Sequence, residues 1–494
     1  MSGVPLHIAV PDGTAPYWLA LLQRSGLPVH TLGSAPAAGA LLFLPDAAGT
    51  RCTATRREVE RLRHRGTPAL AGREWGASFG VQLPRGGALG LSATTNDGVR
   101  RLDPAPLLVL PLPTAATLLR ASAQLTTIAG ADGRSVMEVI ATADHGGLRR
   151  CVLAGLRSLA FACERPFVHL AHTPLGFDAT LAVRIDADSF RATATAATTA
   201  SLARAGLRAT WFLDVERHLQ HGGLDCAREL RAAGHEVQSH FFRHYTYRSA
   251  ARNEQNLRRS LDELRALGVT ATAAAAPFGT WNRGLDAALR ACGMRWSSEF
   301  SRVHDEVSGA LAGEADEVWQ VPIHPVCPAL LFAAGADVGA VHAWFLAELQ
   351  QCLQRGEPAV FYGHPIDDLE RCPELLPSVA AAARQQVRSL WQPTLGELHD
   401  FYRARAAQVV HVELADGVLR GAIDGRAPLV VERVGEPAVH VAGKFVLPLE
   451  SPTEAVHPHG PILTPAPYRP RTGRRDRLRT HRLQFARLLR ELRR

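Results

Sequence analysis

Two histidines, His240 and His244, stand four residues apart in the stretch GHEVQSHFFRHYTYR, directly after a short apolar segment. If this stretch turns helical, both imidazoles share one face about 6 Å apart, which suits two ligands of one zinc ion. The same spacing is common on solvated helix faces. The pair therefore indicates a metal site only if other ligands converge on it.

Two aspartates supply the other candidate ligands. Asp186 and Asp188 end an apolar segment in RIDADSF, and residues two apart on a strand point the same way. One carboxylate and two imidazoles fill three positions on zinc and leave the rest open to water and substrate. The second carboxylate is then free to act as a base toward that water, and His364 in AVFYGHP is placed to act as an acid. Taken singly, an aspartate pair is often a turn or a helix cap, and Gly-His-Pro is a good turn.

The strands and helices predicted around these residues would bring them together at one end of a barrel. Strand and helix signals alternate over residues 176–408, where the expected strands are TLAVRID, RATWFLDV, HEVQSH, TATAAAAP, MRWSSEF, VWQVPIH and PAVFYGH. The clearest helices, NEQNLRRSLDELRALG and VGAVHAWFLAELQQCLQRG, each end at a glycine. This alternation predicts an α/β fold, a distorted (β/α)7-type barrel. In such barrels the chemistry lies at the carboxyl ends of the strands, where all the candidate residues fall.

The rest of the chain divides by composition. Residues 1–115 alternate strands such as GALLFLP and TPALAG with helices such as TRREVERLRHRG, which predicts a small flavodoxin-like or glutamine-amidotransferase-like α/β domain. It has no GxGxxG after its first strand and no cysteine at a nucleophile turn, so a structural or partner-binding role is favoured. We expect linker helices over 116–175. The period-two pattern around DG and GK turns predicts a small β unit at 409–450, and a Pro-rich linker with a basic tail follows at 451–494.

The charge distribution bears on partners. The net charge is +8, yet residues 468–494 alone carry eleven arginines against two acidic residues, so the remainder is close to neutral. We therefore expect no nucleic-acid partner. Segment 474–494 has an apolar face among its arginines, the make-up of an interfacial helix that could contact an anionic membrane. The apolar residues of that face are Leu478, Phe485, Leu489 and Leu492.

Cysteine usage and apolar runs bear on location. The eight cysteines form no CxxC pair, which favours free thiols in a reducing compartment. We see no secretory signal at the N-terminus and no apolar run of about 18 residues that would span a membrane. We expect a cytoplasmic protein, at the inner face of the membrane if the tail binds there.

The order of the motifs and the residues in them resemble those of the polysaccharide deacetylase (NodB-homology, carbohydrate esterase family 4) superfamily over roughly residues 180–405. RIDADSF is similar to the aspartate motif of the aminoarabinose deformylase branch. The resemblance implies that Asp186 is the catalytic base and His364 the acid. It also implies a divalent metal, most often Zn²⁺. The implied metal ligands are Asp188, His240 and His244.

The stretch APFGTWN resembles the motif that forms one wall of the family's substrate groove. The substrate-binding residues implied there are Pro277, Phe278, Gly279, Trp281 and Asn282. RWSSEF takes the place of the family's aspartate–tryptophan motif. Trp296 and Glu299 in it either line the groove or are a core tryptophan and a surface glutamate.

One position departs from the family pattern. The arginine that usually positions the aspartate base is replaced by Ala275. Arg184, Arg243 and Arg295 are candidates to take its place. Arg184 is favoured, because on a strand it would share a face with Asp186.

The resemblance implies a hydrolase that removes an acetyl or formyl group from an N-acylated sugar. A cytoplasmic or lipid-linked glycan precursor of polysaccharide biosynthesis fits the expected location. Two alternatives stay open: a catalytically silent carbohydrate-binding or scaffold module, and an amidohydrolase acting on a non-sugar amide or imide.

Overall fold

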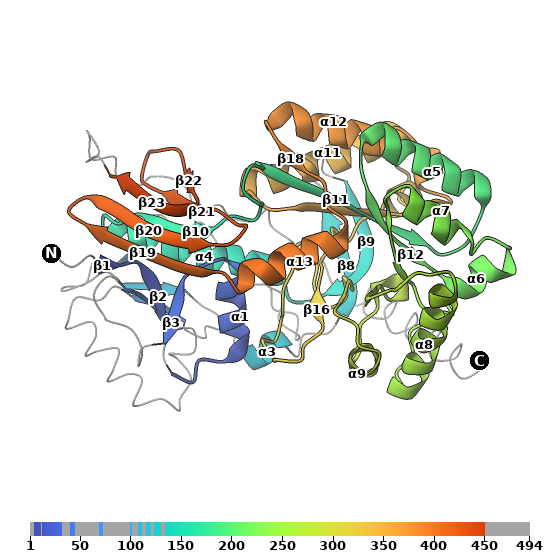
Figure 1. Ribbon diagram of the computed structural model, residues 1–494, viewed down its shortest axis with the longest axis horizontal. Coiled ribbons are helices and arrows are strands. Elements are labelled where there is room, and N and C mark those ends of the chain that lie inside the picture. The colour runs from blue at the N-terminus through green and yellow to red at the C-terminus, as the bar shows by residue number, and fades with distance from the viewer. Residues whose placement is uncertain are drawn as a thin grey trace.

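The computed structural model describes two lobes that lie side by side (Figure 1). One lobe is a barrel of parallel strands with helices outside it. The other combines an N-terminal sheet with strands from the C-terminal part of the chain. The described residues are 4–10, 12–31, 40–44, 69–72, 99–100, 107–110, 115–119, 123–129 and 134–449. Within these ranges no helix combines the length and the apolar character needed to cross a bilayer.

The barrel lobe is built on one curled sheet in the order β16-β15-β14-β13-β12-β11-β17, with β18 against β11. Every pairing in this sheet is parallel. The segment after β16 meets β17 where the His324 N–H donates to the Val360 carbonyl at 2.8 Å. This confirms the expected α/β barrel, and each of the seven expected segments contains a strand. The strands are β11 (Ala179–Ala187), β12 (Ala209–Leu213), β13 (Glu236–Ser239), β14 (Ala273–Ala274), β15 (Trp296–Ser297), β16 (Trp319–Gln320), β17 (Ala359–Gly363) and β18 (Leu390–Trp391).

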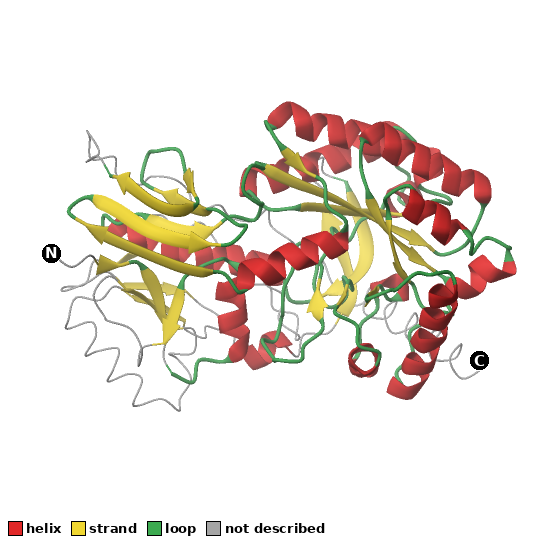
Figure 2. Cartoon of the chain, in the orientation of Figure 1, coloured by secondary structure: helices red, strands yellow, loops and turns green. Residues whose placement is uncertain are grey.

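Helices cover the outside of this sheet (Figure 2). All nine residues of β11 are buried, as expected for a central parallel strand that is covered on both faces. The helix α11 ends at Gly356, which adopts φ +63°. The helices are α5 (Ala192–Ala205), α6 (Val215–Gln220), α7 (Cys226–Ala232), α8 (Ala250–Ala266), α9 (Arg283–Ala291), α10 (Pro328–Ala333), α11 (Val338–Arg355), α12 (Leu375–Gln386) and α13 (Leu395–Ala406), with the short turns η2 (Pro277–Gly279) and η3 (Leu369–Arg371).

The N-terminal sheet has the order β3-β2-β4-β5-β7-β6. Its first five strands are parallel, in the order that flavodoxin-like folds use, and β6 is antiparallel to β7. Its core packs Trp18 and Phe43 against Leu156 of a long helix, α4. The elements are β2 (His7–Val10), α1 (Pro16–Arg24), β3 (Val29–Thr31), β4 (Ala40–Leu44), β5 (Ala69–Gly72), β6 (Val99–Arg100), β7 (Leu107–Leu110), α3 (Ala115–Leu119) and α4 (His145–Ala162). The expected helix TRREVERLRHRG lies outside the described residues.

The expected linker helices over 116–175 are only partly correct. α4 is present, but β8 (Ala123–Ala129) and β9 (Ser135–Ala141) form an antiparallel hairpin. The hairpin is rich in β-branched residues, as in AQLTTIA and SVMEVIA, and these favour a strand. Its buried side chains, Ile128 and Ile140, join the core of the barrel lobe.

The expected β unit at 409–450 exists, but it is not separate. β1 (Val4–Pro5) pairs with β19 (Val409–Ala415) in a sheet completed by β20 (Val418–Asp424) and β23 (Gly443–Pro448). A second sheet joins β10 (Phe167–Leu170), β21 (Leu429–Glu432) and β22 (Val439–Val441). Strands from two earlier segments, β1 and β10, complete these sheets and cover edges that would otherwise be unpaired. Segment 451–494, including the predicted interfacial helix, lies outside the described residues.

A buried network of arginine–glutamate ion pairs joins the two lobes. Arg149 on α4 donates through Nε to Glu306 Oε1 at 2.5 Å and also binds Glu357, and both acids belong to loops of the barrel lobe. Arg150 donates to Glu357 at 3.1 Å. Arg24 on α1 lies 3.8 Å from Glu306. All seven cysteines among the described residues are free thiols.

Candidate metal centre and acid–base site

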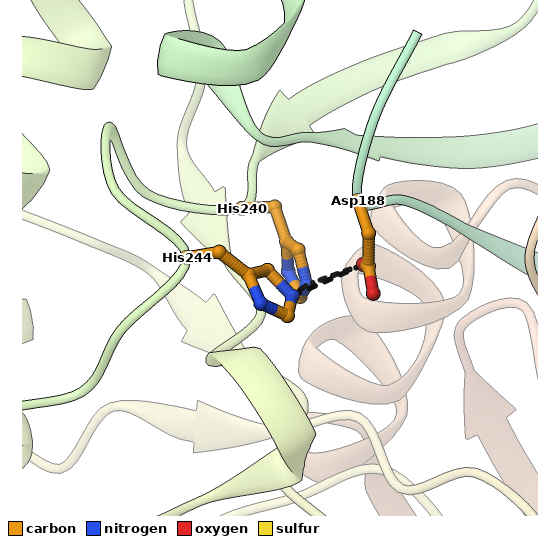
Figure 3. A group of neighbouring side chains, drawn as sticks. All are labelled: Asp188, His240 and His244. Carbon is orange, nitrogen blue, oxygen red and sulfur yellow. Dashed lines mark hydrogen bonds and ion pairs between the residues drawn. The ribbon is translucent and has the colours of Figure 1, made fainter. Parts of the chain in front are cut away.

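Three predicted ligand atoms converge at the carboxyl ends of β11 and β13 (Figure 3). Asp188 Oδ1 lies 3.2 Å from His240 Nε2 and 3.2 Å from His244 Nε2. The two histidine Nε2 atoms are themselves 3.2 Å apart. The three donors therefore form a nearly equilateral triangle, and Figure 3 shows the rings turned toward the carboxylate.

The triangle has the dimensions of one face of a metal coordination shell. Zinc binds nitrogen and oxygen donors at about 2.0–2.2 Å, which places neighbouring donors about 3.0–3.5 Å apart. The three measured separations fall inside that range. One carboxylate and two imidazoles are also a donor set that zinc and related ions accept. The residues present fit a divalent ion.

The tautomer of His240 is fixed by its surroundings. Its Nδ1 lies 2.7 Å from the carbonyl oxygen of Ala275, which can only accept a hydrogen bond. Nδ1 therefore carries a proton, which leaves Nε2, the nitrogen on the side of Asp188, as the one available to an ion. Ligand histidines in metal sites are commonly oriented in this way. Thus the residue that replaces the usual arginine supports a ligand through its backbone.

The two histidines do not lie on a helix, so the helical condition attached to their spacing is not met, and a loop brings the rings together instead. After β13 the chain turns at Phe241, a fully buried residue in the left-handed region at φ +68°. Asn256 on α8 then holds the loop: its Oδ1 accepts from Arg243 N at 2.8 Å, and its Nδ2 donates to the carbonyls of Arg243 and Tyr245 at 3.1 Å each. Tertiary hydrogen bonds thus replace the helix that the spacing suggested.

Asp186 is held by Arg184 within the barrel. Arg184 donates through Nε to Asp186 Oδ1 and through Nη2 to Oδ2, both at 2.6 Å. Its remaining nitrogen, Nη1, donates to the carbonyl and the hydroxyl of Ser298 at 2.5 and 3.0 Å. The guanidinium lies between the rings of Phe212 and Tyr362. A two-point contact of this kind fixes the plane of the carboxylate.

The electrostatics keep both aspartates ionised. Burial alone would raise the pKa of Asp186, but the Arg184 guanidinium, with a smaller effect from His240, holds it below its ordinary value. Burial also opposes the charge on Asp188, and the two histidine partners outweigh it and hold the pKa of Asp188 well below its usual range.

The other two candidate arginines lie elsewhere. Arg243 pairs with Glu216 at 3.2 Å, and Arg295 pairs with Asp400 at the surface. Of the three candidates, only Arg184 contacts Asp186 among the described residues. In RWSSEF, Trp296 is a fully buried core residue, as one alternative expected. Glu299 is not at the surface: it is buried and accepts from Ser297 Oγ at 2.6 Å.

His364, at the end of β17, lies on the other side of Asp188. Its Nε2 is 4.0 Å from Asp188 Oδ2, and its Nδ1 donates to Asp368 Oδ2 at 2.8 Å. Burial disfavours a charged ring, but the fully buried Asp368 outweighs it and holds the pKa of His364 well above its ordinary value. This arrangement suits a proton donor. Asp368 was not among the predicted residues, although a carboxylate four residues after a candidate histidine was a usable signal.

The predicted groove residues separate into two groups. Phe278 is 55 % exposed in the left-handed region at φ +57°, and its ring lies against His244 with centroids 4.9 Å apart. Pro277 and Gly279 are buried beneath it, and a side chain at Gly279 would meet the Phe300 ring at 2.4 Å.

The second group lies farther along the same stretch. Trp281 is half-buried beneath the guanidinium of Arg302, which lies 4.1 Å from the ring centroid. Asn282 caps α9 by accepting from Leu285 N at 2.9 Å, and it donates to the carbonyl of Tyr247 at 3.0 Å. Its amide is thus engaged by the fold. Phe278 is the groove residue that faces the site most directly.

Comparison with known proteins gives one family match. Residues 177–297 match the family model for polysaccharide deacetylases. No curated protein matches the sequence.

Solved structures with a similar arrangement include three worth describing. A Mycobacterium smegmatis protein, provisionally assigned as a polysaccharide deacetylase, is 16 % identical, with a TM-score of 0.39 over 47 % of this chain and 93 % of that one. A family 4 carbohydrate esterase from Streptomyces lividans, solved with acetate, is 16 % identical, with a TM-score of 0.32 over 44 % and 93 %. A Bacillus anthracis pseudoenzyme of the same esterase family is 14 % identical, with a TM-score of 0.33 over 46 % and 66 %. Likenesses this distant do not decide function.

Proposed function

We propose that this chain is a metal-dependent deacylase of an N-acylated sugar, because residues 177–297 match the model of the polysaccharide deacetylase family, which comprises hydrolases of amide and ester bonds. The observation that carries the proposal is the triangle of Asp188, His240 and His244, with Asp186 and His364 flanking it. The acyl group would be released as acetate or formate.

The ion would be held by the three donors of the triangle, and Zn²⁺ fits them best. When bound, it would supply Lewis-acid polarisation of the acyl carbonyl. The rest of the chemistry belongs to side chains of the chain. Asp186 takes a proton from the attacking water, since its carboxylate is ionised and its plane is fixed by Arg184.

His364 would complete the reaction as the acid. It donates a proton from Nε2 to the departing amine nitrogen, while Asp368 holds the ring through Nδ1. The exposed ring of Phe278, beside His244, supplies an apolar wall against which the acyl group or the sugar can pack. Products are an amino sugar and a small carboxylate.

The silent-module alternative is less favoured. Its support was the missing arginine at Ala275. The bidentate Arg184–Asp186 contact provides a base-orienting group from a different position. A catalytically silent site would not require a buried arginine with all three of its nitrogens bonded.

Release of amine from a substrate panel tests the proposal. N-acetylated amino sugars, formylated amino sugars and cyclic imides are compared with wild type, Asp186→Asn and the surface control Asp262→Asn. We expect release from an N-acylated sugar by wild type and the control, and a loss of about 10²–10⁴-fold in Asp186→Asn. Equal rates in Asp186→Asn and wild type would rule out the assigned base, and release from imides alone would favour the amidohydrolase alternative.

For the substrate's location, we propose a cytoplasmic or lipid-linked glycan precursor. Free cysteines support a reducing compartment, and the arginine-rich segment 474–494 supports contact with an anionic membrane. Sedimentation with anionic liposomes, with and without residues 466–494, tests the second point. Equal pelleting of the two proteins would end the membrane proposal.

A further inference from the structure

A second cluster of metal-binding side chains adjoins the site. Cys327, His364 and Asp368 each offer a ligand atom, and these atoms lie within 4.8 Å of one another. Cys327 follows the β16 segment at the start of α10, and the other two residues follow β17. The cysteine plays no part in the proposed reaction. It is nevertheless buried beside the histidine assigned as the acid.

The hydrogen bonds of His364 determine which nitrogen could bind an ion. Nδ1 is committed to Asp368 Oδ2 at 2.8 Å. Nε2 is therefore the nitrogen left to face an ion. A carboxylate that holds the far nitrogen of a histidine is the usual support of a metal-bound imidazole. Asp368 thus has the geometry of an orienting group, and His364 that of a ligand.

Asp188 faces both clusters. Its Oδ1 lies 3.2 Å from His240 and His244, while its Oδ2 lies 4.0 Å from His364 Nε2. The two oxygens of one carboxylate thus face different donors: Oδ1 faces the two histidines of the triangle, and Oδ2 faces His364. Carboxylates in this position bridge pairs of ions about 3.5–4 Å apart in two-metal hydrolases. His364 is also partly exposed, with 24 % of its side chain accessible, so an ion can reach it from the site.

We propose a second, inhibitory zinc site, in which Cys327 Sγ and His364 Nε2 of this cluster bind the ion, Asp368 holds the His364 ring, and Asp188 Oδ2, from the neighbouring triangle, is the third ligand. A thiolate and an imidazole select zinc over magnesium or calcium. On binding, the Cys327 thiol and His364 Nε2 each release a proton to solvent, and the ion occupies the nitrogen that would otherwise protonate the leaving amine. The inhibitory effect rests on the proposed function, whereas the site itself does not.

Cobalt titration of the full-length, metal-free protein tests the site without any activity assay. A thiolate bound to Co²⁺ gives an intense charge-transfer band in the near ultraviolet, which nitrogen and oxygen ligands do not give. We expect this band in wild type as the second equivalent binds. We also expect it in His240→Ala, which lacks the first site. Cys327→Ser and Cys327→Ala should lack it, while Cys226→Ser, at a buried cysteine on α7, should keep it.

The outcomes are distinguishable. Absence of the band in wild type, or its persistence in both Cys327 variants, would overturn the second site. Two substitutions are used so that one that fails to fold, as judged by thermal unfolding, does not decide the result. For inhibition, excess zinc should slow amine release by wild type, and Cys327→Ser should need at least tenfold more zinc for the same effect. Equal zinc sensitivity would overturn the inhibitory role. If no substrate is hydrolysed, the cobalt result still decides the site.

Discussion

At the scale of single residues, Arg184 orients the base Asp186, and Ala275 orients the ligand His240. Arg184 binds Asp186 from the same strand, two residues away, so no arginine is needed at position 275 to orient the base. The carbonyl of Ala275 instead fixes the tautomer of His240. The strand periodicity of two was enough to favour Arg184 from the sequence, because it places Arg184 and Asp186 on one face.

Arg184→Ala tests this positioning role. Without the guanidinium, Asp186 is buried with an unpaired charge and no fixed plane, so we expect kcat to fall about 10²-fold or more while KM and metal content stay near wild type. We also expect a loss of about 3–5 kcal/mol in the free energy of unfolding. Arg184→Lys, a point charge without the two-pronged geometry, should restore only part of kcat. A merely structural role would be indicated if kcat per folded, metal-loaded molecule were unchanged.

Asp368→Asn tests the orientation of the acid. An amide side chain cannot stabilise a charged His364 ring, so we expect amide hydrolysis to slow by about 10²-fold or more. The loss should be much smaller for an aryl ester, whose leaving group needs no protonation. Asp367→Asn, at the exposed neighbour, is the matched control. Equal losses on the amide and the ester would contradict a role in proton donation.

At the scale of elements, the site follows from where strands end. Apolar runs such as TLAVRID and PAVFYGH identify β11 and β17, so the sequence could predict that Asp186, Asp188 and His364 meet at one edge. The spacing of His240 and His244 suited a helix face, but a loop carries both residues. The shape of this loop depends on hydrogen bonds from Asn256, which lies more than ten residues away on α8. The spacing of the two histidines alone cannot predict such contacts.

The same limit applies to the pairing of distant strands. The alternation in VVHVELADGVLRGAI predicts a hairpin, but nothing in it indicates that β1 from the N-terminus completes the sheet. Likewise, residues 123–141 were assigned to linker helices, although their β-branched residues favoured strands. Local sequence patterns predict which segments form strands or helices. Which strands pair with one another depends on the sheet edges and faces that the rest of the fold leaves uncovered.

Asn256→Ala tests whether the loop is held from α8. The variant leaves three backbone groups of the loop without partners, so we expect the free energy of unfolding to fall by about 1–3 kcal/mol. Zinc affinity, measured by calorimetry, should fall by about tenfold or more, because the rings lose their fixed positions. Asn253→Ala is the comparison, since Asn253 holds Tyr247, farther along the loop. A larger loss of zinc affinity in Asn253→Ala than in Asn256→Ala would contradict the assignment.

At the scale of the whole molecule, the two lobes are joined by buried charge as well as by shared strands. Arg149 projects from α4, a helix of the N-terminal core, to acids in two barrel loops. Burial opposes the charge on Glu357, but Arg149 and Arg150 outweigh it and hold the pKa of Glu357 below its ordinary 4.5. The pairing therefore stabilises the folded chain above about pH 4.5, and the stabilisation is lost as the pH falls through the lowered value.

Arg149→Met tests the junction. At neutral pH the variant leaves Glu306 and Glu357 short of a partner, so we expect the free energy of unfolding to fall by about 3–5 kcal/mol. The difference from wild type should shrink below about pH 4.5 as Glu357 is protonated. Adding Glu306→Gln and Glu357→Gln to Arg149→Met should recover much of the loss. Denaturant unfolding at several pH values measures both effects, and a deficit that grew toward low pH would contradict this explanation.

Reconstitution of metal-free protein tests the central claim most directly. Release of the acyl group from an N-acylated amino sugar is measured while zinc is added to wild type and to His240→Ala. If Asp188, His240 and His244 hold the ion that the reaction requires, activity should be absent without metal and return with the first equivalent in wild type. In His240→Ala neither first-site metal binding nor activity should return. Full activity in the metal-free protein, or in a His240→Ala variant, would contradict the claim.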